Sequence, residues 1–127
     1  MKILIVDDIK GWRDYHYHIL SNLFPNANFT FAESAREAYD KLLENTEVPF
    51  DIIFTDMQME SDFEPKYAGE WFIEQIKTFN CYNKTEIIIS SAAYNIAHIA
   101  ETYSVKYLRK STARNFPDSY KDIVGQY

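Results

Sequence analysis

Six polar side chains of chemically useful types each follow a short apolar run of this sequence. They are Asp7, Asp8, Asp56, Ser90, Ser91 and Lys110. Three carboxylates brought close together repel one another unless cationic charge compensates them. Carboxylate oxygens suit a hard cation such as Mg²⁺, and an ammonium group offers a point charge for a phosphate. If these side chains meet, they form a site for a divalent cation and a phosphoryl group.

The same set contains a candidate nucleophile. Once a metal ion and the lysine neutralise part of the negative charge, one carboxylate can attack phosphorus and form an acyl phosphate. A serine hydroxyl close to that carboxylate can donate a hydrogen bond to the same phosphate. The residue types therefore favour phosphoryl-transfer chemistry, provided that the fold gathers them.

The apolar runs predict the strands of a parallel sheet. They are Ile3–Val6, Phe29–Ala32, Ile52–Phe54, Ile87–Ile89 and Val105–Leu108. Continuous apolar runs are typical of strands buried on both faces. Helical spacing of apolar residues follows each run, in the segments Trp12–Leu23, Ala35–Leu42, Phe72–Phe79, Ile96–Tyr103 and Phe116–Val124. This alternation predicts an α/β fold, in which ligands bind beyond the carboxyl ends of the strands.

Composition excludes several other classes of protein. The chain has 127 residues, which fits one domain over residues 1–127, and its net charge of −6 argues against nucleic-acid binding. Cys81 is the one cysteine, so an intrachain disulfide is excluded and a reducing compartment is favoured. We find no signal peptide and no apolar run near the roughly 20 residues of a membrane span. We therefore expect a cytoplasmic domain without membrane contact.

Four segments, taken in order, resemble the receiver domain of two-component response regulators. They are Ile3–Asp8 with Arg13, Asp51–Met59, Ile87–Ala92 and Tyr107–Lys110. Each segment alone is a weak signal, but the four in this order are specific, and the resemblance covers essentially the whole chain. It implies a doubly wound, five-stranded parallel sheet of order 2-1-3-4-5, as in flavodoxin-like folds, with five flanking helices.

The resemblance also implies a role for each matching residue. Asp56 matches the aspartate that is phosphorylated. Asp7 and Asp8 match the acidic pair that binds Mg²⁺ or Mn²⁺ together with Asp56, and the backbone carbonyl of Gln58 matches a further ligand. Lys110 matches the lysine that contacts the phosphoryl group.

Two further positions concern the response to phosphorylation. Ser91 matches the phosphate-binding hydroxyl, because Ala92 after it is the small residue usual in the family, and Ser90 stays the alternative. Tyr107 matches the aromatic residue that turns inward on phosphorylation. That movement would change the surface formed by the fourth helix, the fifth strand and the fifth helix.

The sequence departs from the family pattern at three places. Met59 is followed by Glu60 instead of the usual proline, and Ser111 replaces the proline that commonly follows the lysine. The family's next glycine matches Gly69, which makes Glu60–Ala68 an extended loop beside the site. None of these changes removes a group that the chemistry needs.

The resemblance implies a phosphoacceptor switch. A histidine kinase or phosphotransfer protein would phosphorylate Asp56, and the changed surface would control a downstream protein or an output domain outside this chain. A phosphorylation-dependent homodimer is a further expectation. Such a domain catalyses only its own phosphorylation and dephosphorylation. Ala93 offers no polar group to orient an attacking water, so we expect a long-lived phosphoryl state.

Other hypotheses fit parts of the same pattern. A phosphorylation-independent interaction module would keep the acidic site without using it. A phosphohydrolase with an aspartate nucleophile would need a second aspartate two residues later, where the chain has Gln58. His16 and His18 cannot share a helical face, so instead of a metal site we expect one partly packed and one exposed histidine.

Overall fold

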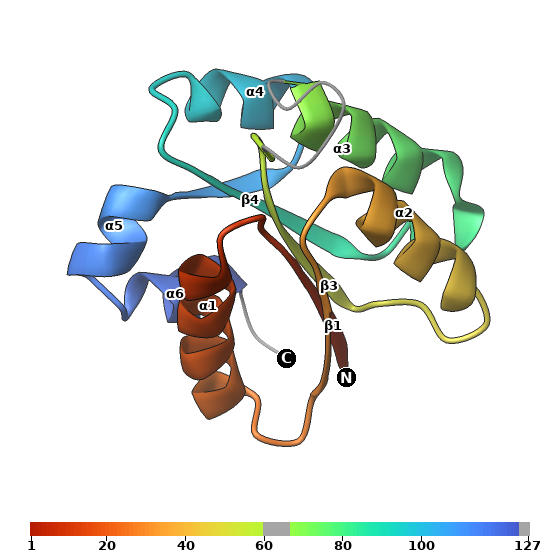
Figure 1. Cartoon of the computed structure of the whole chain (residues 1–127), viewed down its shortest axis with the longest axis horizontal. Coiled ribbons are helices and arrows are strands. Elements are labelled where there is room, and N and C mark those ends of the chain that lie inside the picture. Colours follow the sequence, from red (N-terminus) through yellow and green to blue (C-terminus); the bar gives the residue numbers. More distant parts are fainter. Residues whose placement is uncertain (60–66, 125–127) are drawn as a thin grey trace.

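The computed structural model describes residues 1–59 and 67–124, and its centre is a five-stranded sheet (Figure 1). The strands are β1 (Lys2–Val6), β2 (Asn28–Ala32), β3 (Ile52–Asp56), β4 (Glu86–Ser91) and β5 (Lys106–Arg109). Their order is β2-β1-β3-β4-β5, and all neighbouring strands are parallel. The predicted fold class and strand order are confirmed.

Helices alternate with these strands. They are α1 (Lys10–Leu23), α2 (Ala35–Glu44), α3 (Ala68–Thr78), α4 (Ile96–Tyr103), α5 (Lys110–Asn115) and α6 (Ser119–Val124), and the 3₁₀ helix η2 (Asn80–Tyr82) follows α3. Ser34 caps α2, because its hydroxyl accepts a 3.0 Å hydrogen bond from the backbone N–H of Glu37. No helix within residues 1–59 and 67–124 is long and apolar enough to span a membrane.

Two hydrophobic clusters cover the two faces of the sheet. Helices α2, α3 and α4 pack on one face, around a cluster that includes Leu42 and Phe72. Helices α1, α5 and α6 pack on the other, around a cluster that includes Phe54 and Tyr120 (Figure 1). We call these the α2–α3–α4 side and the α1–α5–α6 side.

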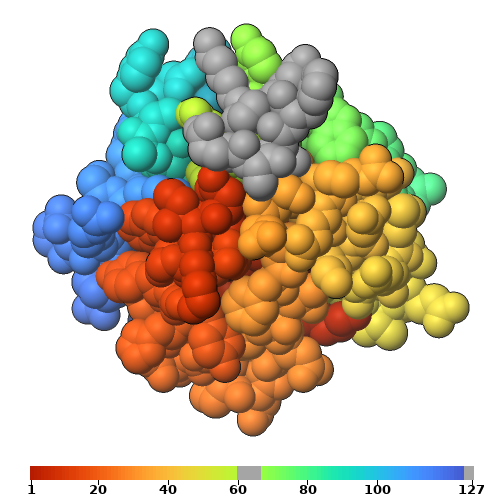
Figure 2. Space-filling model, viewed as in Figure 1, coloured from red at the N-terminus to blue at the C-terminus, as the bar shows by residue number. Residues whose placement is uncertain are grey.

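Segments far apart in the sequence meet on the α1–α5–α6 side. Tyr15 of α1 donates its hydroxyl to the carbonyl oxygen of Ala113 in α5, over 2.8 Å. Figure 2 shows the red and orange atoms of the α1 region beside the blue atoms of the α5 region. The helix that follows β1 thus packs against the helix that follows β5.

The last predicted helix differs from the observed structure. The sequence predicted one helix from Phe116 to Val124, whereas in the structure that helix, α6, begins at Ser119. An additional helix, α5, precedes it and is separated from it by a turn that contains Pro117. A residue before proline is disfavoured in the helical region, and Phe116, with φ −134° and ψ 78°, lies outside that region. Six α-helices therefore replace the expected five in the described residues.

The extended loop predicted at Glu60–Ala68 lies mostly outside the described residues. The description resumes at Tyr67, and α3 begins at Ala68.

Candidate functional site

The strand ends place three carboxylates at one edge of the sheet, which we call the carboxyl edge. Asp56 is the last residue of β3, and Asp7 follows the last residue of the neighbouring strand β1. With Asp8, they offer carboxylate oxygens that all lie within 4.8 Å of one another. Asp7 is fully buried and Asp56 is 5% exposed, so water screens their charges poorly. The structure brings these three residues together, as the sequence predicted.

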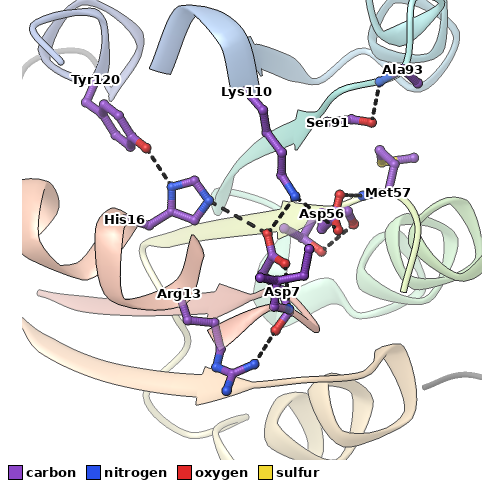
Figure 3. Close-up of polar contacts among 11 residues, drawn as sticks. Asp7, Arg13, His16, Asp56, Met57, Ser91, Ala93, Lys110 and Tyr120 are labelled. Atoms are coloured by element: carbon purple, nitrogen blue, oxygen red, sulfur yellow. Dashed lines mark hydrogen bonds and ion pairs between the residues drawn. The ribbon is translucent and has the colours of Figure 1, made fainter. Parts of the chain in front are cut away.

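Lys110 supplies a cation to this cluster. It is the first residue of α5, and its ammonium nitrogen lies 3.0 Å from Asp7 Oδ2 and 3.4 Å from Asp56 Oδ2 (Figure 3). The same nitrogen lies 5.0 Å from the centre of the Trp12 ring, a distance typical of a cation–π contact. Lys110 therefore faces the buried carboxylates of both Asp7 and Asp56 with one positive charge.

Burial governs the ionisation of the two inner carboxylates. It raises the pKa of Asp56 to about 7; the charge of Asp7 acts in the same direction, and Lys110 opposes both. Burial also raises the pKa of Asp7, against a hydrogen bond from Ile9 and the charge of Lys110. A divalent cation would reverse these effects, because it stabilises the ionised carboxylates. The donor set fits a hard, oxygen-seeking ion such as Mg²⁺ or Mn²⁺.

The turn after β1 holds Asp7 in place. Its Oδ1 accepts a 2.9 Å hydrogen bond from the backbone N–H of Ile9, just before α1. Its carbonyl oxygen accepts a 2.7 Å hydrogen bond from the guanidinium group of Arg13. Arg13 also lies 3.8 Å from the carboxylate of Glu33, so α1 is tied to the end of β2 as well.

Backbone contacts hold Asp56 from the α2–α3–α4 side. Its Oδ1 accepts a 2.8 Å hydrogen bond from the N–H of Met57, whose carbonyl accepts one of 3.0 Å from Gly69. A Cβ on Gly69 would lie 2.4 Å from the Cα of Met57, a separation that the backbone cannot tolerate. Helix α3 thus packs its glycine directly on the chain that follows the candidate nucleophile.

The two serines end β4, next to the strand that carries Asp56. Ser91 accepts a 3.0 Å hydrogen bond from the backbone N–H of Ala93, so its own O–H remains a donor for a phosphate oxygen. The Oγ of Ser90 is buried and has no hydrogen-bond partner among the described residues. In that part of the chain, no hydrogen bond joins either serine to Asp56, so the expected role of Ser91 stays a prediction.

The remaining predicted site residues are more exposed. Gln58 is exposed two residues after Asp56. Tyr107 in β5 is 38% exposed, and the guanidinium carbon of Arg109 lies 5.8 Å from the centre of its ring. The ring is therefore partly exposed, and the predicted inward movement would bury it.

His16 lies closer to this site than its sequence position indicated. We expected a partly packed side chain; instead the residue is 1% exposed, and its ring centre lies 4.7 Å from that of Phe54. Its Nε2 lies 3.9 Å from Asp7 Oδ2, and its Nδ1 lies 2.6 Å from the hydroxyl of Tyr120 in α6 (Figure 3). Burial, aided by the charge of Lys110, lowers the pKa of His16 to about 3, so the ring is neutral. His18 is exposed, as expected.

Comparisons with known proteins bear on this geometry. No family model matches the chain, and no curated protein matches it either. Among solved structures, the chemotaxis response regulator CheY4 of Vibrio cholerae matches with a TM-score of 0.75 and 20% identity, over 96% of this chain and 97% of the other. The signal receiver domain of the response regulator merR from Colwellia psychrerythraea matches with a TM-score of 0.75 and 24% sequence identity, over 99% of each chain. The chain has the receiver-domain fold.

A third structure with the receiver-domain fold was determined with a metal ion. The response regulator TrrA of Thermotoga maritima, in complex with Mg²⁺-BeF, matches with a TM-score of 0.70 and 19% identity, over 96% of this chain and 97% of TrrA. At these identities the likeness establishes the fold.

Proposed function

We propose that this chain is a phosphoacceptor signalling domain, in which Asp56 accepts a phosphoryl group from a histidine kinase or phosphotransfer protein. The observation that carries this proposal is the group of Asp7, Asp8 and Asp56 beside Lys110 at the carboxyl edge, in which Asp7 and Asp56 are buried. The receiver-domain fold and the Mg²⁺-BeF complex of TrrA support it.

In the proposed transfer, a carboxylate oxygen of ionised Asp56 forms a bond to phosphorus. The bond between phosphorus and the imidazole nitrogen of the donor histidine breaks, and the leaving nitrogen keeps the electron pair. Asp56 has to be ionised for this attack, which burial alone disfavours. Its hydrogen bond from Met57 holds Oδ1, which leaves Oδ2 as the oxygen that faces Lys110.

The other residues of the cluster bind and neutralise charge. Asp7, Asp8, Asp56 and the backbone carbonyl of Gln58 would hold Mg²⁺ or Mn²⁺, which supplies charge stabilisation for the phosphoryl oxygens. Lys110 would exchange its contacts with the carboxylates for one with a phosphoryl oxygen. The Ser91 hydroxyl would donate to another.

The output surface would be the face around α4, β5 and α5. Tyr94 is 91% exposed there, and a groove of about 530 Å³ is lined by β5 together with Thr112 and Ile123. Movement of Ser91 toward the phosphoryl group would make room for Tyr107 to turn inward and change this face. A downstream protein, an output domain or a second copy of the chain would respond to that change.

Loss of the phosphoryl group would be slow. Attack by water on the acyl phosphate gains from a polar side chain that orients the water, and Ala93 offers none. Ala93→Glu should therefore shorten the lifetime of the phosphorylated form, as followed by intact mass over time. An unchanged or longer lifetime would contradict this part of the proposal.

The proposal is tested by incubating the protein with a small phosphodonor and Mg²⁺ and measuring its intact mass. We expect one added phosphoryl group in the wild type and in Asp40→Ala, a control on the exposed face of α2, and none in Asp56→Ala. No adduct, or an equal adduct in Asp56→Ala, would contradict the proposal. An unmodified protein would instead favour the phosphorylation-independent interaction module.

A further inference from the structure

His16 and Tyr120 form a buried polar contact that the proposed chemistry does not use. Both side chains are almost completely buried, on α1 and α6 respectively, and the ring of Phe54 packs against both, with centre distances of 4.7 Å and 5.6 Å. A polar pair inside an otherwise apolar cluster is costly unless its hydrogen-bonding groups are satisfied. Apolar side chains of similar size would fill this space without that cost, so packing alone does not explain why a polar pair is buried here.

The hydrogen bond between the two side chains determines where the imidazole proton lies. Within residues 1–59 and 67–124, His16 Nδ1 is the one hydrogen-bond partner of the Tyr120 hydroxyl, at 2.6 Å. A buried hydroxyl needs an acceptor for its hydrogen, so Tyr120 donates to Nδ1. The neutral ring then carries its single hydrogen on Nε2, the nitrogen that faces Asp7.

The Nε2–H group points at the less well satisfied oxygen of Asp7. Oδ1 is occupied by the N–H of Ile9, whereas the buried Oδ2 has an ion pair with Lys110 and no well-aligned hydrogen bond among the described residues. Nε2 lies 3.9 Å from Oδ2, which is an electrostatic contact longer than a hydrogen bond. If Lys110 turns to a phosphoryl group, His16 remains as the polar contact of that oxygen.

We propose that His16, with its proton position fixed by Tyr120, is a positioning residue for Asp7 that raises the affinity of the acidic cluster for a divalent cation. Side chains that orient a metal ligand from outside typically change metal affinity by about 10–100-fold when they are removed. This inference rests on the proposed metal-dependent function. It adds a link between the acidic cluster and α6.

The test compares two amides that replace different atoms of the imidazole. In His16→Gln, the amide nitrogen can occupy the place of Nε2 and face Asp7, whereas in His16→Asn the amide lies at the place of Nδ1 and faces Tyr120. The probe is Mn²⁺, with free Mn²⁺ measured by electron paramagnetic resonance. Urea unfolding of the metal-free variants records their stability separately.

We expect His16→Gln to keep the Mn²⁺ dissociation constant within about threefold of wild type, and His16→Asn to weaken binding by about tenfold. Tyr120→Phe should weaken binding by a smaller factor. Tyr82→Phe removes a buried hydroxyl from the other side of the sheet and should leave binding unchanged. If His16→Asn does not fold, the proposal is tested by comparing Mn²⁺ binding of Tyr120→Phe with that of Tyr82→Phe. Weaker binding in Tyr120→Phe alone supports the proposal, and equal binding in the two variants overturns it.

Equal Mn²⁺ affinities of the Gln and Asn variants would overturn the role of His16. If the wild type still binds Mn²⁺ and accepts a phosphoryl group, the proposed function survives that result. A wild type that binds no Mn²⁺ would overturn both proposals together.

Discussion

The two sides of the sheet bury the same kind of aromatic pair for different purposes. On the α2–α3–α4 side, Tyr82 stacks on Phe50 and donates its hydroxyl to the carbonyl oxygen of Leu42, over 2.7 Å. On the α1–α5–α6 side, Tyr120 stacks on Phe54, but its hydroxyl contacts the side chain of His16.

The two tyrosines therefore differ in what their hydroxyl groups contact: a backbone carbonyl in one case and a side chain next to the acidic cluster in the other. The first tyrosine satisfies a backbone group at a distance from the site. The second belongs to a chain of polar contacts that ends at Asp7. Buried Asp, His and Lys side chains of the described residues lie at the carboxyl edge or on the α1–α5–α6 side, namely Asp7, His16, Asp56 and Lys110. The α2–α3–α4 side instead holds the site through backbone packing.

The largest effect that we expect comes from the buried charge at the carboxyl edge. The pKa of Asp56 rises from its ordinary 3.8 to about 7 on folding, so between these pH values the folded protein holds a proton that the unfolded chain releases. The contribution of Asp56 to the stability of the metal-free protein should therefore fall as pH rises from about 4 to about 7, by at most about 4 kcal/mol. Buried His16, whose pKa is lowered to about 3, contributes with the opposite sign over the same interval, so the Asp56 contribution is read from the difference between the wild type and Asp56→Asn. Urea unfolding in a chelator measures this.

The stability of the metal-free wild type should fall relative to that of Asp56→Asn as pH rises through this interval, and Mg²⁺ should restore stability near pH 7 in the wild type. A wild type whose stability stays constant or rises relative to Asp56→Asn over the same interval would contradict the role of burial at Asp56.

Two glycine substitutions test the backbone packing on the α2–α3–α4 side: Gly69 lies in that packing, and Gly11 in α1 serves as the comparison. Gly69→Ala should lower the free energy of unfolding by roughly 1–3 kcal/mol, because its Cβ would lie 2.4 Å from the Met57 backbone. Gly11→Ala in α1 should raise it by roughly 0.5–1 kcal/mol, because a Cβ there meets nothing within 4 Å and alanine favours the helix. Similar changes in both variants would remove the contrast between the sides.

The smallest effect concerns the two tyrosines and is measured by double-mutant cycles. His16→Val and Tyr120→Phe should show a coupling energy of about 0.5 kcal/mol or more, because the two side chains share one hydrogen bond. His16→Val and Tyr82→Phe should be additive to within about 0.3–0.5 kcal/mol, since they lie on opposite sides of the sheet. Equal couplings in the two cycles would mean that Tyr120 supports the fold as Tyr82 does.

Much of the fold and of the site could be predicted from local patterns. Apolar runs followed by Asp7, Asp56 or Lys110 are contiguous in the sequence, and the rule that ligands bind at the carboxyl ends of parallel strands brings them together. Helix α5 was missed, because no helix was predicted between Lys110 and Asn115. Pro117 was accepted in the first turn of the last helix, whereas α6 begins after it, at Ser119.

The contacts that tune the site could not be predicted in the same way. Helical spacing placed His16 on the apolar face of its helix, but its partner Tyr120 lies 104 residues later. Likewise, the close approach of Gly69 to Met57 depends on how α3 packs on the end of β3. Both contacts depend on tertiary packing, about which the periodicity of one segment carries no information.

The central claim is that Asp56 itself carries the phosphoryl group. Its most direct test is to treat the protein with a phosphodonor and Mg²⁺, reduce it with borohydride, and sequence the peptides by mass spectrometry. Reduction converts an aspartyl phosphate to homoserine, so we expect homoserine at position 56. Homoserine at another aspartate, or none in protein that has gained a phosphoryl group, would contradict the account.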